Sequence, residues 1–160
     1  MLRRNLVLGF VLLGIFWASP AGANGGTLYD LSGTATVRVG SVSQSFPVTA
    51  MLALNSDRTY LYQEDGANIS DMGAWFELKG KLMLYTSNLL EQIINLEQEI
   101  GMEAMEPVQI TPLKSKSRVT ISPLTGVLSV RTDSSYQVFL MVSNLTVKVS
   151  TRSVMTGNPI

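Results

Sequence analysis

The side chains best suited to acid–base chemistry are four carboxylates in one stretch of the chain, Asp57, Glu64, Asp65 and Asp71. Two carboxylates can hydrolyse a glycoside when they flank the sugar bond at about 5 to 9.5 Å. The chain contains no histidine and no cysteine, which removes the usual nucleophile–base pairs and the imidazole and thiolate metal ligands. Aspartate near glycine is more typical of turns. We therefore expect these carboxylates to splay into solvent, and we expect no catalytic residue, metal site or cofactor.

Aromatic and methionine side chains form the second candidate set. Tyrosine and tryptophan join an apolar ring to a polar tip, and methionine adapts to irregular apolar shapes, so both suit a pocket for an apolar ligand. The same residue types also pack ordinary cores, and the pattern leaves both interpretations open. The candidate ligand-binding residues are Phe46, Leu52, Tyr60, Tyr62, Trp75, Met83, Tyr85, Ile93, Tyr136 and Met141.

Most of the elements that must position these side chains are predicted to be β-strands. From Leu28 onward, apolar and polar residues alternate with period two, which is typical of antiparallel strands with one buried face. Turn-forming residues interrupt the pattern at 55–58, 80, 122–126, 133–135 and 143–144. The sequence therefore predicts a mainly β fold, an antiparallel up-and-down meander of about nine strands that forms a barrel or half-barrel. The residues expected to face inward are Phe46, Val48, Leu52, Leu82, Leu84, Leu128, Val130, Val138, Leu140, Val147 and Val149.

One helix is predicted in the middle of the chain, at about residues 88–100. Asn88 and Glu91 have the spacing of a capping box, and Gly101 suits a left-handed C-cap. We expect the helix to pack on the barrel mouth or the sheet face, or to act as a mobile lid. The residues expected on its packed face are Leu89, Ile93, Leu96 and Ile100. The last residues, 155–160, are expected to fray.

The first 23 residues have the pattern of an export signal. Arg3 and Arg4 precede an apolar run over 6–17, and the small residues Ala21 and Ala23 flank Gly22 as a signal peptidase requires. The run is shorter than the roughly 20 residues that span a bilayer. We expect cleavage after Ala23, by either the Sec or the twin-arginine route, to leave 24–160 as a single periplasmic or secreted domain without a transmembrane segment.

Charge is divided along the chain. Residues 24–106 hold four basic and eleven acidic side chains, a net charge of −7, whereas 107–160 hold six basic and one acidic, a net charge of +5. Such a division could join the two halves of the fold or produce an oriented, dipolar surface. It is not the footprint of a nucleic-acid-binding protein.

A family resemblance is carried by two segments, Leu-Asn-Ser-Asp-Arg-Thr-Tyr at 54–60 and Gly-Ala-Trp-Phe-Glu-Leu-Lys-Gly-Lys-Leu at 73–82. Together they resemble the aspartate turn, Thr-Tyr and Gly-x-Trp hairpin pattern of bacterial lipocalin-like, calycin-type β-barrels. Lipocalins carry Gly-x-Trp near the first strand and their main helix after the barrel, whereas Trp75 and the predicted helix lie in mid-chain here. That helix is similar to the one in open half-barrels that carry lipids or lipoproteins through the periplasm. Both resemblances imply binding of an apolar ligand.

These observations support three hypotheses. The first is an exported, non-enzymatic protein that binds a small apolar or amphipathic ligand inside the barrel. The second is a structural or interaction module of the cell envelope, which docks a protein partner through a sheet edge or through the charge-divided surface. The third is a carboxylate-based hydrolase.

Overall fold

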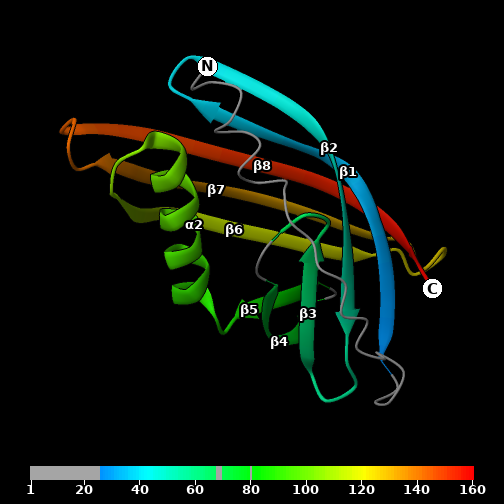
Figure 1. The fold of residues 1–160 in the computed structure, drawn as a ribbon. Coiled ribbons are helices and arrows are strands. Elements are labelled where there is room, and N and C mark those ends of the chain that lie inside the picture. The colour runs from blue at the N-terminus through cyan, green and yellow to red at the C-terminus, as the bar shows by residue number, and fades with distance from the viewer. Residues whose placement is uncertain (1–25, 68–69, 80) are drawn as a thin grey trace.

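Eight antiparallel strands close into a barrel in the computed structural model, which describes residues 26–67, 70–79 and 81–160 (Figure 1). Each strand pairs with the next one along the chain, and the last pairs with the first, so the predicted up-and-down order is confirmed. The predicted export signal lies outside the described residues. The elements are β1 (Thr27–Val39), β2 (Val42–Leu54), β3 (Thr59–Glu64), β4 (Asp71–Leu78), β5 (Lys81–Thr86), α2 (Leu89–Ala104), β6 (Val108–Ile121), β7 (Leu128–Leu140) and β8 (Leu145–Pro159).

The strand count is eight rather than nine because the turn expected at 133–135 does not form. β7 runs straight through these residues, and Asp133 lies opposite Lys116 on β6 and Arg152 on β8. Its carboxylate pairs with Arg131 Nε at 3.0 Å and with Arg152 Nε at 2.5 Å. Strand pairing on both sides therefore overrides the local turn preference of Asp and Ser.

The C-terminal tail, expected to fray at 155–160, is part of the barrel instead. β8 continues to Pro159, and Met155 is only 1% exposed. Gly157 makes this pairing possible, since an added Cβ there would lie 1.9 Å from the carbonyl oxygen of Asp30 on β1. The tail is therefore ordered by its close approach to β1, which closes the barrel.

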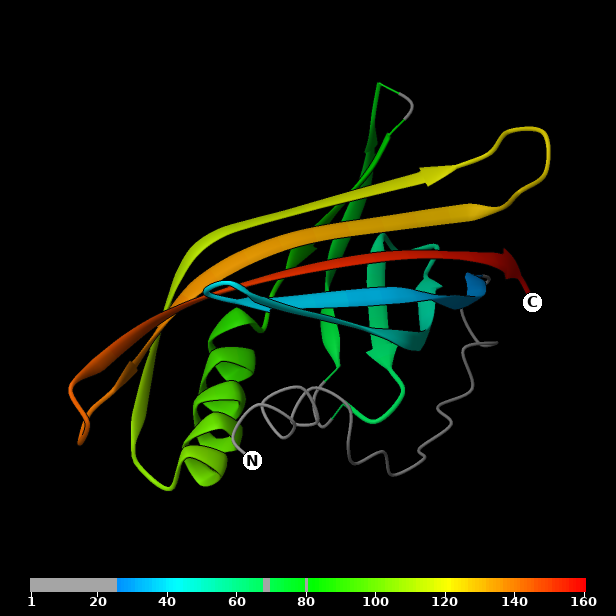
Figure 2. The same cartoon turned by 90° about the horizontal axis from the view of Figure 1, so that it is seen from above.

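The helix α2 is longer than predicted and is capped differently. It ends at Ala104, and its left-handed C-cap is Met105, with a φ of 57°, rather than Gly101. The side chain of Asn88 makes no capping bond. It accepts a hydrogen bond from the Met72 backbone N–H at 3.3 Å and donates one to the Ser70 carbonyl at 2.8 Å. The start of the helix is therefore tied to the beginning of β4, inside the bend of the long strands β6 to β8 (Figure 2).

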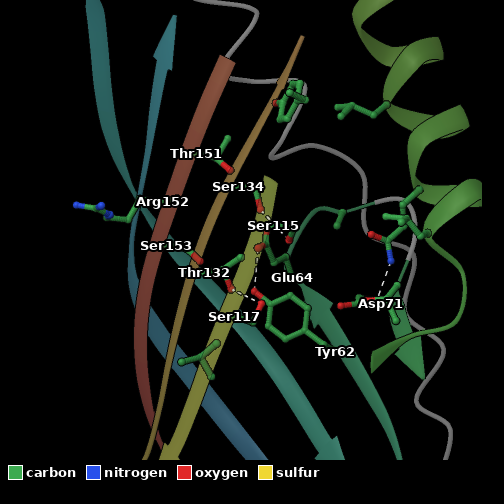
Figure 3. A pocket seen from close by; sticks show the side chains of 18 of the residues that line it. Tyr62, Glu64, Asp71, Ser115, Ser117, Thr132, Ser134, Thr151, Arg152 and Ser153 are labelled. Carbon is green, nitrogen blue, oxygen red and sulfur yellow. Dashed lines mark hydrogen bonds between the residues drawn. The ribbon is translucent and has the colours of Figure 1, made fainter. Parts of the chain in front are cut away.

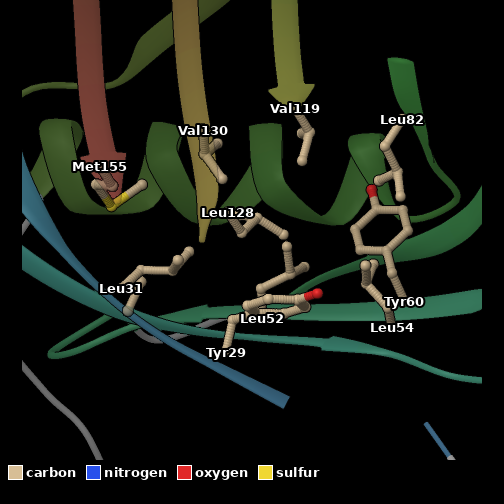
Figure 4. Packing of buried hydrophobic residues seen from close by; sticks show 11 residues of the cluster. Tyr29, Leu31, Leu52, Leu54, Tyr60, Leu82, Val119, Leu128, Val130 and Met155 are labelled. Atoms are coloured by element: carbon tan, nitrogen blue, oxygen red, sulfur yellow. The ribbon is translucent and has the colours of Figure 1, made fainter. Parts of the chain in front are cut away.

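The barrel holds two separate apolar clusters. The larger, here called the Leu31 cluster, consists of Tyr29, Leu31, Ala50, Leu52, Leu54, Tyr60, Leu82, Val119, Leu128, Val130 and Met155. In it, Met155, Val130 and Val119 point from one wall toward Leu31 and Leu52 on the other (Figure 4). The second, the Tyr136 cluster, consists of Val37, Ile100, Val108, Ile110, Tyr136, Val138 and Val149. All the residues predicted to face inward belong to one of the clusters or pack against it, as the alternation required.

Most of the predicted packed face of α2 lies on the Tyr136 cluster. Ile100 is buried in it, and Ile93 and Leu96 pack against it. Leu89 is 53% exposed, so the first turn of the helix is not part of the core.

A β-bulge in β6 changes which of its residues face inward. The register to β7 shifts between Pro112 and Lys114, so Leu113 is an extra residue in this strand. Val108 and Ile110 are buried before the bulge, and Val119 is buried after it, so the inward positions change from even to odd numbers. This change places Ser115 and Ser117 on the inner side and the basic residues that alternate with them on the outer side.

Candidate ligand-binding cavity

Six small hydroxyl side chains separate the two clusters. The strand register aligns them in two rows across β6, β7 and β8. We call this set the hydroxyl belt; its rows are Ser117, Thr132, Ser153 and Ser115, Ser134, Thr151. On one side of the belt lies the row Val119, Val130, Met155, and on the other lies the pair Tyr136 and Val149.

The belt lines a cavity of about 400 Å³. The interior of an eight-stranded barrel is just filled when its inward side chains are large, so small side chains on three adjacent strands leave space. Two pairs of the hydroxyls lie across the β6–β7 ladder, with Ser115 Oγ 3.2 Å from Ser134 Oγ and Ser117 Oγ 3.4 Å from Thr132 Oγ1. The hydroxyl belt therefore makes the cavity wall on this side polar without adding charge.

The opposite wall of the cavity contains Tyr62 and Glu64 of β3. Tyr62 donates a hydrogen bond to Glu64 Oε1 at 2.8 Å, and its hydroxyl lies 3.7 Å from the sulfur of Met155 on β8. Both side chains point toward the hydroxyl belt (Figure 3). Burial raises the pKa of the Glu64 carboxyl above its usual value, and the bond from Tyr62 offsets part of this rise. Burial also raises the pKa of the Tyr62 hydroxyl.

Asp71 joins three elements at the edge of the cavity. One of its oxygens, Oδ1, accepts hydrogen bonds from Tyr60 Oη at 2.9 Å and from Gln92 Nε2 on α2 at 3.1 Å. Gln92, Asn95 and Glu99 bring the polar side of the helix to the cavity lining. The helix therefore contributes apolar residues to the Tyr136 cluster and polar residues to the cavity.

Tyr136 lines the cavity with a buried hydroxyl group. The residue is 8% exposed, and its Oη makes no hydrogen bond with any residue that the structure describes. Leaving a buried polar group unsatisfied costs about 1 to 3 kcal/mol. A ligand that supplied a hydrogen-bonding group near this hydroxyl would recover part of that cost.

The cavity is open between β5 and β6. These strands pair only at Leu82 and Val119, and beyond this point they separate. Ser115 and Ser117 line the cavity and are nevertheless exposed, so the cavity is accessible to solvent along this side. Further along β6, the helix covers the strand edge, because Glu97 Oε1 accepts a hydrogen bond from the Ile110 N–H at 2.7 Å.

Most of the charged groups of the lining are acidic. Glu64, Asp71 and Glu99 line the cavity, and Arg152 is the one basic residue among its lining residues. Arg152 points away from the other labelled side chains (Figure 3) and pairs with Asp133. The interior is therefore favourable for neutral or cationic groups and unfavourable for anionic ones.

The structure brings three of the predicted ligand-binding residues to this cavity, Phe46, Tyr62 and Tyr136. Leu52 and Tyr60 belong to the Leu31 cluster, and Trp75 packs against it with its indole N–H donating to the Asn55 carbonyl at 3.0 Å. Ile93 packs against the Tyr136 cluster.

The remaining three candidates lie away from the cavity. Met83 and Tyr85 alternate with the inward residues Leu82 and Leu84, and Tyr85 is 58% exposed, where it stacks on Phe76 at a ring distance of 5.1 Å. Met141 is 49% exposed, beyond the end of β7.

The hydroxyl belt is not among the residues predicted from the sequence. Its signal was present, since Ser or Thr occurs at alternate positions in each of the three strands. The turn predicted at 133–135 would divide β7, however, and so it conceals the alternation of hydroxyls along this strand.

The four carboxylates behave in two different ways. Asp57 is a turn former, as predicted, and accepts hydrogen bonds from the Thr59 N–H at 2.9 Å and the Thr59 hydroxyl at 2.6 Å. Asp65 accepts a hydrogen bond from Thr49. The prediction that all four splay into solvent is wrong for Glu64 and Asp71, which line the same cavity because β3 and β4 are paired neighbours. In the described part of the chain, no three carboxylates converge closely enough to hold a metal ion.

The fold and the cavity define a class of protein, an eight-stranded antiparallel β-barrel with a solvent-accessible internal cavity lined by hydroxyls and acids. No protein-family model matches the chain, and no curated protein matches it with significant similarity. Within the described residues, no helix is both long enough and apolar enough to cross a membrane.

Proposed function

We propose that this protein is an exported, non-enzymatic carrier that binds one small amphipathic molecule inside its barrel. The observation that carries the proposal is the cavity of about 400 Å³ between two apolar clusters, with polar groups on both of its walls. Ligand sites are typically concave, with apolar walls and a few polar groups that fix orientation. Export follows from the pattern of the first 23 residues and is part of the proposal.

Different parts of the lining suit different parts of the proposed ligand. The hydroxyl belt, Glu64 and Asp71 suit a polar group that donates hydrogen bonds. Phe46, Leu84 and Leu96 suit an apolar portion. An anionic head group would be placed beside buried or partly buried carboxylates, which is unfavourable at the low effective dielectric of a barrel interior. The proposed ligands are therefore amphipathic alcohols, amides or amines rather than fatty acids.

Displacement of a fluorescent amphipathic probe tests this function. We expect a long-chain amine and the alcohol of equal chain length to displace the probe at lower concentration than the matching fatty acid. Replacing Ser134 with Leu should fill the cavity and weaken binding by about ten-fold or more, because a close-packed interior cannot absorb the added volume. Ser135→Leu is the matched control, since Ser135 has the opposite orientation on the same strand. Equal affinity of both variants, or no displacement by any of the amphipaths, would contradict the proposal.

A second candidate, a carboxylate hydrolase, is favoured by one observation. Glu64 and Asp71 line the same cavity, and the raised pKa of Glu64 suits a general acid. Tyr62 donates a hydrogen bond to one oxygen of Glu64. Tyr60 and Gln92 both donate to one oxygen of Asp71. Turnover of aryl glycosides that is lost in Glu64→Gln would support hydrolysis, and an absence of turnover in the original chain would exclude it for those substrates.

A further inference from the structure

The outer surface of the long strands carries a concentration of basic side chains. We call it the basic face; its cations are Arg38 of β1, Lys114, Lys116 and Arg118 of β6, Arg131 of β7, and Lys148 and Arg152 of β8. All seven are exposed. These four strands lie side by side in both views (Figures 1 and 2), so the cations share one surface.

The strand register shows how these charges are arranged. Lys116, Asp133 and Arg152 form one cross-strand row, and Arg118 lies opposite Arg131 in the next. Asp133 is the one acidic residue in 107–160, and Asp30, exposed on the same face of β1 as Arg38, is the only other acid in these four strands. The ion pairs of Asp133 with Arg131 and Arg152 neutralise at most one of the cations around it. The charge division seen along the sequence is therefore a division in space as well, and most of the excess positive charge lies on this face.

The basic face borders the opening of the cavity. On β6, Lys114, Lys116 and Arg118 alternate with Ser115 and Ser117, and these serines line the cavity beside the gap between β5 and β6. A flat anionic surface bound by the three basic residues would therefore lie next to the opening. This arrangement suits a carrier that takes up or delivers an amphipathic molecule at such a surface.

We propose that the basic face docks the barrel on an anionic lipid bilayer, with the cavity opening next to the membrane. The choice of a bilayer over an acidic protein rests on the proposed carrier function, because a bilayer is where amphipathic molecules reside. Each Lys or Arg close to an anionic membrane strengthens binding by roughly 1 kcal/mol, or about five-fold, and salt weakens this attraction. Several cations on one rigid surface can therefore support reversible docking without an inserted segment.

Vesicle co-sedimentation tests the proposal. The experiment uses the chain from Asn24, because every described strand, the helix and both apolar clusters lie within residues 26–160. Binding is measured to vesicles of phosphatidylcholine, with and without phosphatidylglycerol, at low and at physiological salt. The test variant is Lys114→Gln with Lys116→Gln. The control variant, Arg58→Gln with Lys79→Gln, removes the same charge from two turns outside the basic face. Circular dichroism confirms that both variants are folded.

We expect binding only to the vesicles with phosphatidylglycerol, weakened by salt and reduced about ten-fold or more in the test variant but less than about three-fold in the control. Equal losses in the two variants, or equal binding to both kinds of vesicle, would overturn the proposal. Tighter binding to polyglutamate or to DNA than to the anionic vesicles would overturn the choice of partner. Solution affinity for the amphipathic probe should be unchanged in the test variant, and Ser134→Leu should still bind vesicles. These two results separate failure of docking from failure of the carrier function.

Discussion

The hydroxyl of Tyr62 donates a hydrogen bond to the carboxylate of Glu64, two residues further along β3, at 2.8 Å. Residues two apart share one face of a strand, so both side chains enter the barrel. The hydrogen bond holds the Glu64 carboxylate at the wall of the cavity, opposite the hydroxyl belt. This pair is the most direct link between the fold and the proposed ligand site.

The stability of the barrel should depend on pH through Glu64. Burial raises the pKa of its carboxyl in the folded state above the value in the unfolded chain. The folded state therefore binds the proton more tightly, and the free energy of unfolding should fall as pH rises from the unfolded pKa through the folded pKa. Glu64→Gln keeps an acceptor for Tyr62, so it should remove this slope and raise stability at neutral pH. Urea titrations of both proteins across this pH range measure the effect.

Asp65 provides the control for that measurement. It follows Glu64 in the chain but is exposed. Asp65→Asn should leave the slope unchanged. Parallel pH profiles for the original chain and Glu64→Gln would refute the role assigned to Glu64.

Gly157 should be required for closure of the barrel. Because a Cβ at this position would lie 1.9 Å from the Asp30 carbonyl oxygen, Gly157→Ala forces β8 away from β1. We expect a loss of about 3 kcal/mol or more in the free energy of unfolding. Thr156→Ala, at the exposed neighbouring position, should change it by less than about 1 kcal/mol. Denaturant unfolding measures both, and similar values for the two variants would show that the tail does not contribute to the barrel.

The helix should be a structural part of the core rather than a free lid. Ile93 packs against the Tyr136 cluster, whereas the next residue, Ile94, is 46% exposed. Ile93→Asp should cost on the order of 3 kcal/mol because it buries an unpaired charge, and Ile94→Asp should cost much less. Thermal melts compare the two variants. An unchanged melting temperature in Ile93→Asp would instead mark the helix as mobile.

Export can be tested on the protein itself. If residues 1–23 are a cleaved signal, N-terminal sequencing of the chain recovered from outside the cytoplasm should begin at Asn24. Ala23→Leu should block processing, because the signal peptidase requires a small residue at this position. Asn24→Gln, one residue beyond the cut, should be processed normally. An N-terminus that keeps residues 1–23 in the exported protein would contradict the prediction.

Alternation along the chain was sufficient to predict the β class, the up-and-down order and the inward residues of most strands. These properties are local, because side chains two apart on a strand share one face whatever the strand pairs with. The helix was also predicted, since its apolar residues recur at helical spacing. Its start was predicted to within one residue, whereas its end was misjudged because the left-handed residue that caps the helix is Met105 rather than Gly101.

The tertiary structure decided everything that depends on partners far apart in the sequence. The continuity of β7 through Asp133 requires β6 and β8 on either side, and the order of the tail requires β1 opposite Gly157. The cavity arises because register and one β-bulge align Ser115, Ser134 and Thr151 in a single row. Register is set by pairing across the barrel, and a shift of one residue would turn every one of these side chains to the other face. The sequence by itself therefore determined a barrel or half-barrel of strands with alternating apolar and polar residues. Only the tertiary structure determined where the cavity lies within it.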